Sequence, residues 1–278
     1  MRRSRSAALL LAVLLIGCSA EVTARSQPGS TATDRVPPAV AGTSSTSDSA
    51  LGARPTNPAI SGGSTSSVDD SPRPSGVLVA HVKPAVIVAR AEPDERAAVV
   101  TEMSNPTDMG GPLVFQLVET TVPDPGGWVE VHLPVRPNGT TGWVKGDQLT
   151  LSSNPYRIEV STSEYRLRVF KDDALWLDAE VAIGTGATPT PLGQFYIIEL
   201  LKPPTADGIY GSFAFGLSGF SETLTSFAGG EGVIGIHGTN NPDALGSDVS
   251  HGCVRVANET IEALAGVIPL GTPVVIEA

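Results

Sequence analysis

Apolar and polar residues alternate in short runs along most of the chain after residue 75. Runs such as VLVAHV and GWVEVHLPV, and farther on YRIEV and LWLDAEVAIG, place apolar residues at every second position. A period of two is typical of β-strands with one buried face, and the Pro, Gly, Asn and Asp residues between the runs favour turns. We therefore expect an all-β protein, with a small antiparallel barrel or meander over 76–154 and a second β region over 155–278.

The second region carries clear turn and cap signals. Asp172-Asp173 separates two alternating runs and predicts a hairpin turn. Asn258 precedes ETIEALAG and is a good N-cap for a short helix that ends at Gly266. A final apolar run over 273–276 predicts a strand that closes the sheet.

Two loops in this region stand out by composition. The segment GTGATPTPLG, residues 184–193, is rich in Pro and Gly and is a candidate wall or hinge of a site. Residues 202–232 are irregular, glycine-rich and aromatic, and long loops of this kind are often functional lids. Tyr210 has a hydroxyl that could donate to a reacting oxygen. For the phenylalanines we expect packing onto the sheet; they are Phe213, Phe215, Phe220 and Phe227.

The N-terminus predicts export. Residues 1–18 begin with three arginines followed by an apolar run too short to span a bilayer, as in a secretory signal. The run ends in LIGC, which resembles a bacterial lipobox and implies lipid modification of Cys18; the alternative is a plain signal peptide. Residues 19–75 are Ser-, Thr-, Pro- and Gly-rich and are expected to be disordered. Such a linker has a reach of roughly 40–45 Å and would tether the residues that follow it to the outer face of the cell membrane.

Charge narrows the range of partners. The 278-residue chain has a formal net charge of −11, and residues 155–278 hold fifteen acidic but only six basic side chains. An acidic surface repels nucleic acid and anionic lipid. We therefore expect no nucleic-acid partner.

Residues 76–154 resemble bacterial SH3-like domains. The carriers of this resemblance are GWVEV at 127–131 and GWV at 142–144, which flank a turn containing Asn138-Gly139, a strong hairpin signal. Trp128 and Trp143 could line a binding groove, but aromatic residues at strand spacing favour a place in the core. His132 is expected to be structural.

The chemistry concentrates in residues 234–256, IGIHGTNNPDALGSDVSHGCVRV. The stretch contains His237, His251 and Cys253, together with glycines that expose backbone N–H groups. A free thiol in an exported protein suggests a nucleophile, although a buried inert thiol or an intermolecular disulfide is also compatible. Zinc held by these three side chains, with Asp243 or Asp248 as fourth ligand, is a competing hypothesis.

A nucleophilic thiol needs activation. An ordinary thiol is only a few per cent thiolate at neutral pH, and a neighbouring imidazolium is expected to lower its pKa and then to protonate the leaving amine. Backbone N–H groups beside Cys253 could form an oxyanion hole. Composition and spacing do not choose between His237 and His251 as the partner.

The spacing of the histidines and the cysteine is more specific for one protein family than these residues are singly. HGTN at 237–240, followed by SHGCVR at 250–255, is similar to the signature of the YkuD-type L,D-transpeptidases, and GTGATPTPLGQFYI matches that family's upstream block. The resemblance covers about 156–278. It implies a YkuD-type β-sandwich with a short helix and a lid loop, and no cofactor or metal. The order of lipobox, linker, SH3-like module and catalytic domain resembles the lipoproteins of this group.

The resemblance also implies residue roles. Cys253 would be the nucleophile, His237 the general base, His251 an orienting partner, and the N–H groups of Gly252 and Cys253 the oxyanion hole. Ser250 and Arg255 would brace the loop or meet a substrate carboxylate. Further substrate contacts would come from the lid and from the loop after His237; they are Tyr210, Gly238, Thr239 and Asn240.

These roles predict a peptidoglycan L,D-transpeptidase that faces the cell wall. Cys253 would be acylated by a tetrapeptide stem with release of D-alanine, and transfer to an amine would form a 3-3 cross-link. Carbapenems would be covalent inhibitors. An L,D-carboxypeptidase or a protein-to-wall ligase would use the same nucleophile, and a non-catalytic wall-binding lipoprotein is the alternative from another class.

Overall fold

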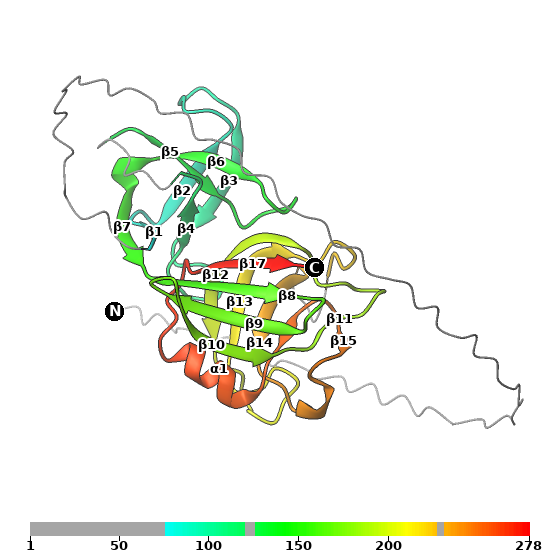
Figure 1. The fold of residues 1–278 in the computed structure, drawn as a ribbon. Helices are drawn as coiled ribbons and strands as arrows, with labels where there is room; N and C mark the ends of the chain where they lie inside the picture. The colour runs from blue at the N-terminus through cyan, green and yellow to red at the C-terminus, as the bar shows by residue number, and fades with distance from the viewer. Residues whose placement is uncertain (1–75, 120–125, 227–230) are drawn as a thin grey trace, which may run out of the picture. The chain divides into compact units, whose positions relative to one another are not determined.

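The computed structural model describes residues 76–119, 126–226 and 231–278 (Figure 1). The predicted signal segment, Cys18 and the linker over 19–75 lie outside the described residues. Within them the chain is mostly β-sheet with one short α-helix, so the all-β prediction is confirmed. None of the helices in this part of the chain is long and apolar enough to cross a membrane.

Residues 77–154 form a seven-stranded antiparallel sheet. Its order is β3-β2-β6-β5-β4-β1-β7. The strands are β1 Val77–Val82, β2 Val86–Arg90, β3 Val99–Ser104, β4 Val114–Leu117, β5 Trp128–His132, β6 Thr141–Lys145 and β7 Leu149–Asn154. The alternating apolar residues meet in one core around Phe115, Val131 and Val144, each fully buried. A 3-10 turn over Gly146–Gln148 joins β6 to β7.

The two tryptophans of this sheet are not in its core. Trp128 and Trp143 are both half-buried, and the valines next to them in sequence, Val129 and Val144, fill the core instead. Lys145 Nζ lies 4.3 Å from the centre of the Trp128 ring, a cation–π contact. The expectation of core packing was wrong here because the period-two pattern places valine, not tryptophan, on the inner face.

The predicted β5–β6 hairpin is present, with a longer connection than a two-residue turn. β5 and β6 pair antiparallel from Trp128 with Lys145 to His132 with Thr141. Eight residues, 133–140, connect them, and Gly139 has a φ of 82°. The Asn138 side chain accepts from the Phe220 N–H at 2.8 Å and donates to the Phe220 carbonyl at 2.9 Å. The loop therefore extends to the second sheet and bonds it as a strand would.

Residues 156–277 form an eight-stranded mixed sheet of order β10-β9-β8-β17-β12-β13-β14-β16. Its strands are β8 Tyr156–Ser161, β9 Arg166–Lys171, β10 Ala174–Glu180, β12 Gly193–Leu201, β13 Ala214–Phe220, β14 Val233–His237, β16 Val254–Arg255 and β17 Pro273–Glu277. Figure 1 shows β17, in red, between β8 and β12. A separate parallel pair joins β11 Ile183–Gly184 to β15 Asp248–Ser250.

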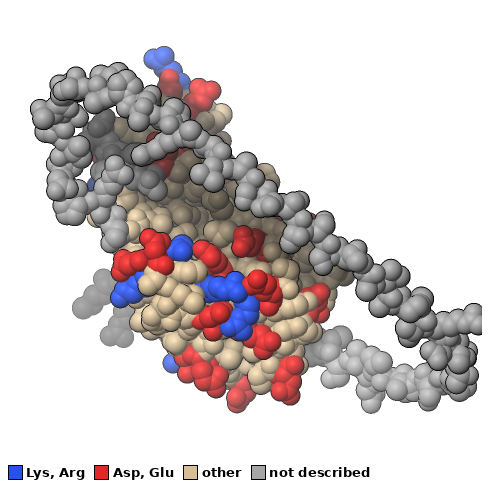
Figure 2. Space-filling view, in the orientation of Figure 1, with Lys and Arg blue, Asp and Glu red and all other residues tan. Residues whose placement is uncertain are grey.

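The turn predicted at Asp172-Asp173 joins β9 to β10. Both residues have positive φ, 47° and 64°, the combination that a two-residue hairpin turn requires and that Asp tolerates better than most side chains. On the outer face of β8–β10, basic and acidic side chains alternate (Figure 2). Their ion pairs include Arg157 with Asp173 and Arg166 with Asp178.

The segment 202–232 is more ordered than its composition predicted. Its middle forms β13, in which Phe215 and Phe220 are buried, and Phe213 packs against the core. Packing of phenylalanines onto the sheet is thus confirmed for these three, and Phe227 lies outside the described residues. Tyr210 remains in the connection before β13.

The predicted helix is α1, Asn258–Ala265, and it packs Ile261 and Leu264 into the sheet core. Gly266 ends it, as expected. Its N-cap, however, is Ala257, without a side-chain cap bond. Asn258 is the first helical residue, and its side chain bonds two loops instead.

Candidate active site

Strand β14 positions His237 at the edge of the core. Ile234 and Ile236 are 2% and 0% exposed and fill the core, so alternation places Val233, Gly235 and His237 on the other face. The His237 ring is buried, and its Nδ1 lies 2.6 Å from the Gly238 carbonyl oxygen. A carbonyl only accepts, so Nδ1 carries the proton and Nε2 keeps its lone pair.

The surroundings of His237 favour the neutral ring. Burial lowers the pKa of His237 to about 4, and the positive charge of Arg255 acts in the same direction. The bond to the Gly238 carbonyl opposes this shift without reversing it. At neutral pH the imidazole is therefore a base with a free Nε2, not an imidazolium.

The loop that carries Cys253 is held from within by Ser250. Ser250 is 1% exposed. Its Oγ donates to the Cys253 carbonyl at 2.5 Å and accepts from the Gly252 N–H at 3.1 Å. Gly252 has a φ of 111°, a left-handed conformation that disfavours any side chain. The Gly252 N–H, expected in the oxyanion hole, is thus engaged with Ser250.

The Pro- and Gly-rich segment supports this loop from outside. The Thr185 N–H and the Thr188 hydroxyl both donate to the Ser250 carbonyl, at 3.0 and 3.2 Å. At Gly184 a Cβ would lie 2.3 Å from the Thr188 carbonyl oxygen, so only glycine fits. The segment is a wall for the cysteine loop, one of the two roles the sequence suggested.

Cys253 is a free, half-buried thiol. Because Val254 points into the core, Cys253 projects from the other face, the same face as His237. Burial raises the pKa of the Cys253 thiol, while a hydrogen bond from the Gly235 backbone N–H and the charge of Arg255 lower it by less. The expected thiolate–imidazolium pair is therefore not the resting state: both groups are neutral.

Arg255 is the cationic group of this site. Its charge lowers the pKa values of His237, Cys253 and Tyr210, which requires all three to be near the guanidinium. Its backbone is fixed by paired bonds with Ala182 at 2.8 and 2.9 Å. Within the described residues, the Arg255 Nε and the Ser212 Oγ are the buried side-chain polar atoms without a hydrogen-bond partner. Both atoms are hydrogen-bond donors without an acceptor.

Tyr210 is brought to the same place by the loop before β13. Its ring centre lies 5.0 Å from that of His237, with the planes at 67°. Burial and the negative charge that Cys253 can carry both raise the pKa of Tyr210. The hydroxyl therefore stays protonated at neutral pH and can donate a hydrogen bond.

Asn258 connects these two segments, a role that the sequence analysis missed. Its Oδ1 accepts from the Thr239 N–H at 3.1 Å and from the Ser212 N–H at 3.4 Å. Gly211 and Gly238 pack face to face beneath it, and a Cβ on Gly238 would lie 2.2 Å from Oδ1. The signal was visible in the sequence, but an Asn before a helix is more simply interpreted as a cap.

The other expected site residues lie around this centre. His251 is exposed on the loop before Cys253. Gly238 and Thr239 are buried and engaged in the loop's own bonds, whereas Asn240 is exposed. Groups of three or more His, Cys, Asp or Glu side chains placed to hold a metal ion are absent from the described part of the chain.

Comparison with known proteins supports one family. Residues 155–276 match the YkuD family model, described as the L,D-transpeptidase catalytic domain. A Bacillus licheniformis protein that bears the L,D-transpeptidase name YkuD is 37% identical over 120 residues; these are 43% of this chain and 64% of the relative. The chain thus spans somewhat less than two thirds of that relative.

Two further proteins are similar to this chain. A solved L,D-transpeptidase catalytic domain from E. faecium, described as acylated by ertapenem, is 24% identical, with coverage of 45% of this chain and 98% of that domain at a TM-score of 0.32. A Bacillus subtilis protein that bears the L,D-transpeptidase name YqjB is 31% identical over 137 residues, which are 48% of this chain and 77% of the relative. On the family model and this last relative together, the chain belongs to the YkuD family of L,D-transpeptidases.

Proposed function

We propose that residues 155–278 catalyse peptidoglycan L,D-transpeptidation with Cys253 as nucleophile and His237 as general base. The observation that carries the proposal is the free Nε2 of a neutral, buried His237 on the sheet face from which the Cys253 thiol projects. Family membership supports a transferase of this type.

In the acylation step the thiol proton passes to His237 Nε2 as sulfur attacks the carbonyl carbon of the third stem residue. The carbonyl electron pair moves to oxygen. Collapse of this intermediate breaks the bond to the terminal D-alanine, whose nitrogen takes the proton back from Nε2. The Gly238 carbonyl stabilises the transient imidazolium because it accepts from Nδ1 at 2.6 Å.

The oxyanion donors we assign are the Cys253 N–H and the Tyr210 hydroxyl. The Gly252 N–H is less suitable than the motif suggested, since it already donates to Ser250. A second donor is therefore needed, and Tyr210 supplies a protonated hydroxyl beside His237. Arg255 would attract the carboxylate of the leaving D-alanine, because its guanidinium charge lies near His237 and Cys253.

In the transfer step an amine of a second stem attacks the thioester. The amine loses its proton to His237 Nε2, the carbon–sulfur bond breaks, and sulfur recovers a proton. With water as acceptor the same steps give an L,D-carboxypeptidase, and with a protein lysine they give a wall ligase. No feature of the described residues favours these acceptors over a stem amine.

The proposal is tested by intact mass and product analysis. After exposure to a carbapenem we expect an adduct on the wild-type protein that is lost in Cys253→Ala. With purified disaccharide tetrapeptide we expect D-alanine release and cross-linked dimers, and His237→Ala should lower the rate by about 100-fold or more, the usual effect of removing a general base.

Other outcomes would change the assignment. Free tripeptide without dimer would replace transpeptidation by hydrolysis, and full turnover in His237→Ala would move the base to His251. A folded protein that forms no adduct and releases no D-alanine would favour the non-catalytic wall-binding alternative.

The setting of the enzyme is part of the proposal. We infer from LIGC at 15–18 that the protein is a lipoprotein on the outer face of the cell membrane, with residues 76–154 as an SH3-like module. The mass of the mature N-terminus would test the anchor, because a lipidated Cys18 adds acyl groups and a plain signal peptide adds none.

A further inference from the structure

Arg136 belongs to the first sheet but bonds the backbone of the second region. It lies in the connection between β5 and β6. Its Nη1 donates to the Ser221 carbonyl at 2.9 Å, and its Nη2 donates to the Leu224 and Glu231 carbonyls at 3.0 and 2.8 Å. Its Cζ lies 4.8 Å from the centre of the Phe220 ring. Hydrogen bonds from a charged donor are stronger than neutral ones, and the planar guanidinium can bond several acceptors at once.

The three carbonyls belong to the two ends of the connection that joins β13 to β14. Ser221 follows the last residue of β13, and Glu231 comes shortly before the first residue of β14. The ends also bond each other, because the Ser221 N–H donates to the Gly232 carbonyl at 2.8 Å. A Cβ on Gly232 would lie 2.3 Å from the Leu224 carbonyl oxygen, so the close approach requires glycine. The guanidinium of Arg136 therefore holds both ends of the connection together.

This connection contacts the cysteine loop through Ser221. Ser221 is 2% exposed. A Cβ on Gly252 would lie 3.9 Å from the Ser221 Oγ, so Ser221 packs beside the glycine that precedes Cys253. Farther along, in β14, the Gly235 N–H donates to the Cys253 sulfur, and His237 is the last residue of that strand. The connection thus contacts the loop of the proposed nucleophile and leads into the strand of the proposed base.

A cavity of about 580 Å³ lies beside these bonds, where the first sheet meets strands β12–β14. Val135, next to Arg136 in the chain, lines it from one side, and Phe220 lines it from the other. An open space provides no atoms for the residues around it to pack against. The two sheets are therefore joined here by polar bonds, those of Arg136 and of Asn138.

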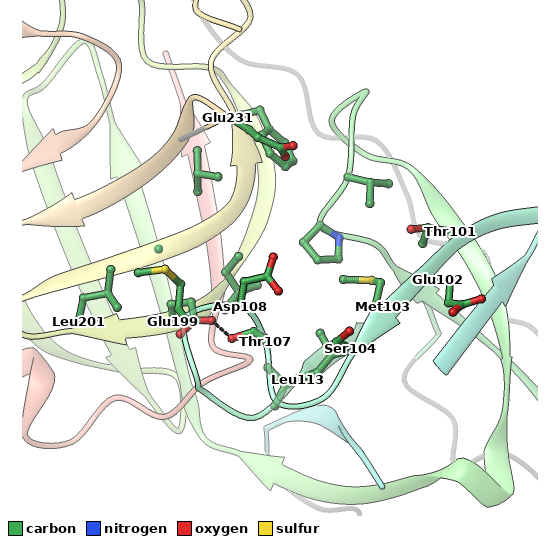
Figure 3. Close-up of a pocket in the computed structure, with 18 residues that line it drawn as sticks. Thr101, Glu102, Met103, Ser104, Thr107, Asp108, Leu113, Glu199, Leu201 and Glu231 are labelled. Atoms are coloured by element: carbon green, nitrogen blue, oxygen red, sulfur yellow. Dashed lines mark hydrogen bonds between the residues drawn. The ribbon is translucent and has the colours of Figure 1, made fainter. Parts of the chain in front are cut away.

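The charges around the cavity favour a cation at this place. Every charged residue that lines it is acidic; these are Glu102, Asp108, Glu199 and Glu231. Figure 3 shows the carboxylates of Asp108 and Glu231 directed into the open space and Glu199 bonded to Thr107. Arg136 provides a positive charge at the edge of the cavity, since it bonds the Glu231 backbone. Within the described residues it forms no ion pair, so its bonds are to the carbonyls.

We propose that Arg136 is a positioning residue of the proposed active site. By holding the two ends of the β13–β14 connection, its guanidinium keeps Ser221 packed against Gly252. It thereby fixes the Cys253 sulfur relative to His237 at the end of β14. The first sheet contributes in this way to catalysis by the second. The effect on turnover rests on the proposed function.

The test compares the wild type, Arg136→Ala, Arg136→Lys and a control, each as the full chain. Steady-state D-alanine release from the disaccharide tetrapeptide gives kcat and KM. In Arg136→Ala we expect kcat to fall by about 10-fold and KM to change by less than about 2-fold, because the reacting groups move while the binding groups remain. Arg136→Lys keeps the charge without the planar fork, so its kcat should lie between those of Arg136→Ala and the wild type. Arg136 is exposed, so the fold is retained.

Arg90→Ala is the matched control. Arg90 is also an arginine of the first sheet, but it donates to a carbonyl of the first sheet's own β2–β3 connection, that of Ala97, at 2.8 Å. This variant should keep the wild-type kcat. Guanidinium ion then separates positioning from a loss of stability. About 50 mM guanidinium chloride, far below a denaturing concentration, should raise the kcat of Arg136→Ala by about 3-fold because the free ion replaces the missing group, whereas it would further impair a destabilised fold. Sodium chloride at the same concentration should not raise it.

The outcomes that contradict the two proposals differ. A wild-type kcat in Arg136→Ala, or a lowered kcat that guanidinium ion does not raise, would overturn this inference and leave the proposed function standing. No D-alanine release from the wild type would overturn the proposed function.

Alkylation of Cys253 by iodoacetamide, measured by peptide mass, tests the positioning role without a peptide substrate. Arg136→Ala should react about 3-fold faster than the wild type and Arg90→Ala, because displacement of the loop exposes the half-buried thiol. Equal alkylation rates in all three proteins would overturn the inference whatever the fate of the proposed function.

Discussion

At the residue scale the central feature is a pair of neutral groups where an ion pair was expected. Burial shifts both groups away from charge, so it lowers the pKa of His237 and raises that of Cys253. The neutral thiol and the neutral imidazole are the ground state, and in the proposed mechanism charge develops only as the thiol attacks. The fixed Nδ1–H to Gly238 bond aligns the ring for that moment.

The protonation state of His237 predicts that the proposed activity tolerates acid. The ring must be neutral to act as base, so the acid limb of kcat/KM for D-alanine release should lie near the pKa of about 4 rather than near the ordinary 6.5. A pH–rate profile from pH 3.5 to 8 measures it. An acid limb near 6.5 would contradict the assignment of His237 as the group whose protonation limits the rate.

The same shift links stability to pH. Between pH 6.5 and 4 the imidazole of residue 237 is protonated in the unfolded chain but stays neutral in the folded protein. The stability that the neutral ring contributes is therefore fully present above pH 6.5 and is lost as the pH falls toward 4. A shift of that size corresponds to about 3 kcal/mol of unfolding free energy. Urea unfolding at pH 7 and 4 should show a smaller loss in His237→Asn than in the wild type.

At the element scale, α1 positions the site as well as closing the core. Asn258 bonds the connections that precede β13 and follow β14, so the helix fixes Tyr210 and His237 relative to each other. Two cues competed at this position. A local sequence cue, Asn before a helix, predicts a cap, while two backbone N–H groups distant in sequence provide better partners for its oxygen.

Asn258→Ala should therefore affect both stability and turnover. Loss of Oδ1 leaves two partly buried N–H groups unpaired, at a cost of about 1–3 kcal/mol. We expect lower kcat with little change in KM for the donor, because the base moves but the binding groups remain. Asn258→Asp keeps the acceptor and should retain most of both properties. Equal kcat values for the two variants would reduce Asn258 to a purely stabilising role.

At the scale of the whole molecule, the two sheets are joined by specific polar bonds as well as by a shared apolar cluster. Tyr196 packs with Val79 and Val114 of the first sheet, and its hydroxyl donates to the His132 carbonyl at 2.9 Å. The Asn138 amide forms two hydrogen bonds with the backbone of Phe220, a residue that lines a cavity between the two sheets. The first sheet thus forms part of the second sheet's surroundings.

We expect the two sheets to unfold together. Asn138→Ala leaves the Phe220 N–H and carbonyl without partners and should lower the unfolding free energy by about 1–3 kcal/mol in a single transition. Asn138→Asp keeps the acceptor oxygen but loses the donor, so its unfolding free energy should lie between those of the wild type and Asn138→Ala. Urea unfolding followed by tryptophan fluorescence, from Trp128 in one sheet and Trp176 in the other, measures the transition. Two separate transitions, with only one affected, would show that the sheets are independent.

The sequence by itself determined the all-β class, the turn at Asp172-Asp173, the end of α1 and the family motif around Cys253. These are local properties, because side-chain alternation, tolerance of positive φ and a short spacing of reactive groups all depend on residues close together in the sequence. The tertiary structure alone decided the charge state of His237 and Cys253, the engagement of the Gly252 N–H, the second role of Asn258 and the acidic cavity. Each of these depends on desolvation or on partners from distant segments, and burial by residues far along the chain leaves no mark on the local pattern.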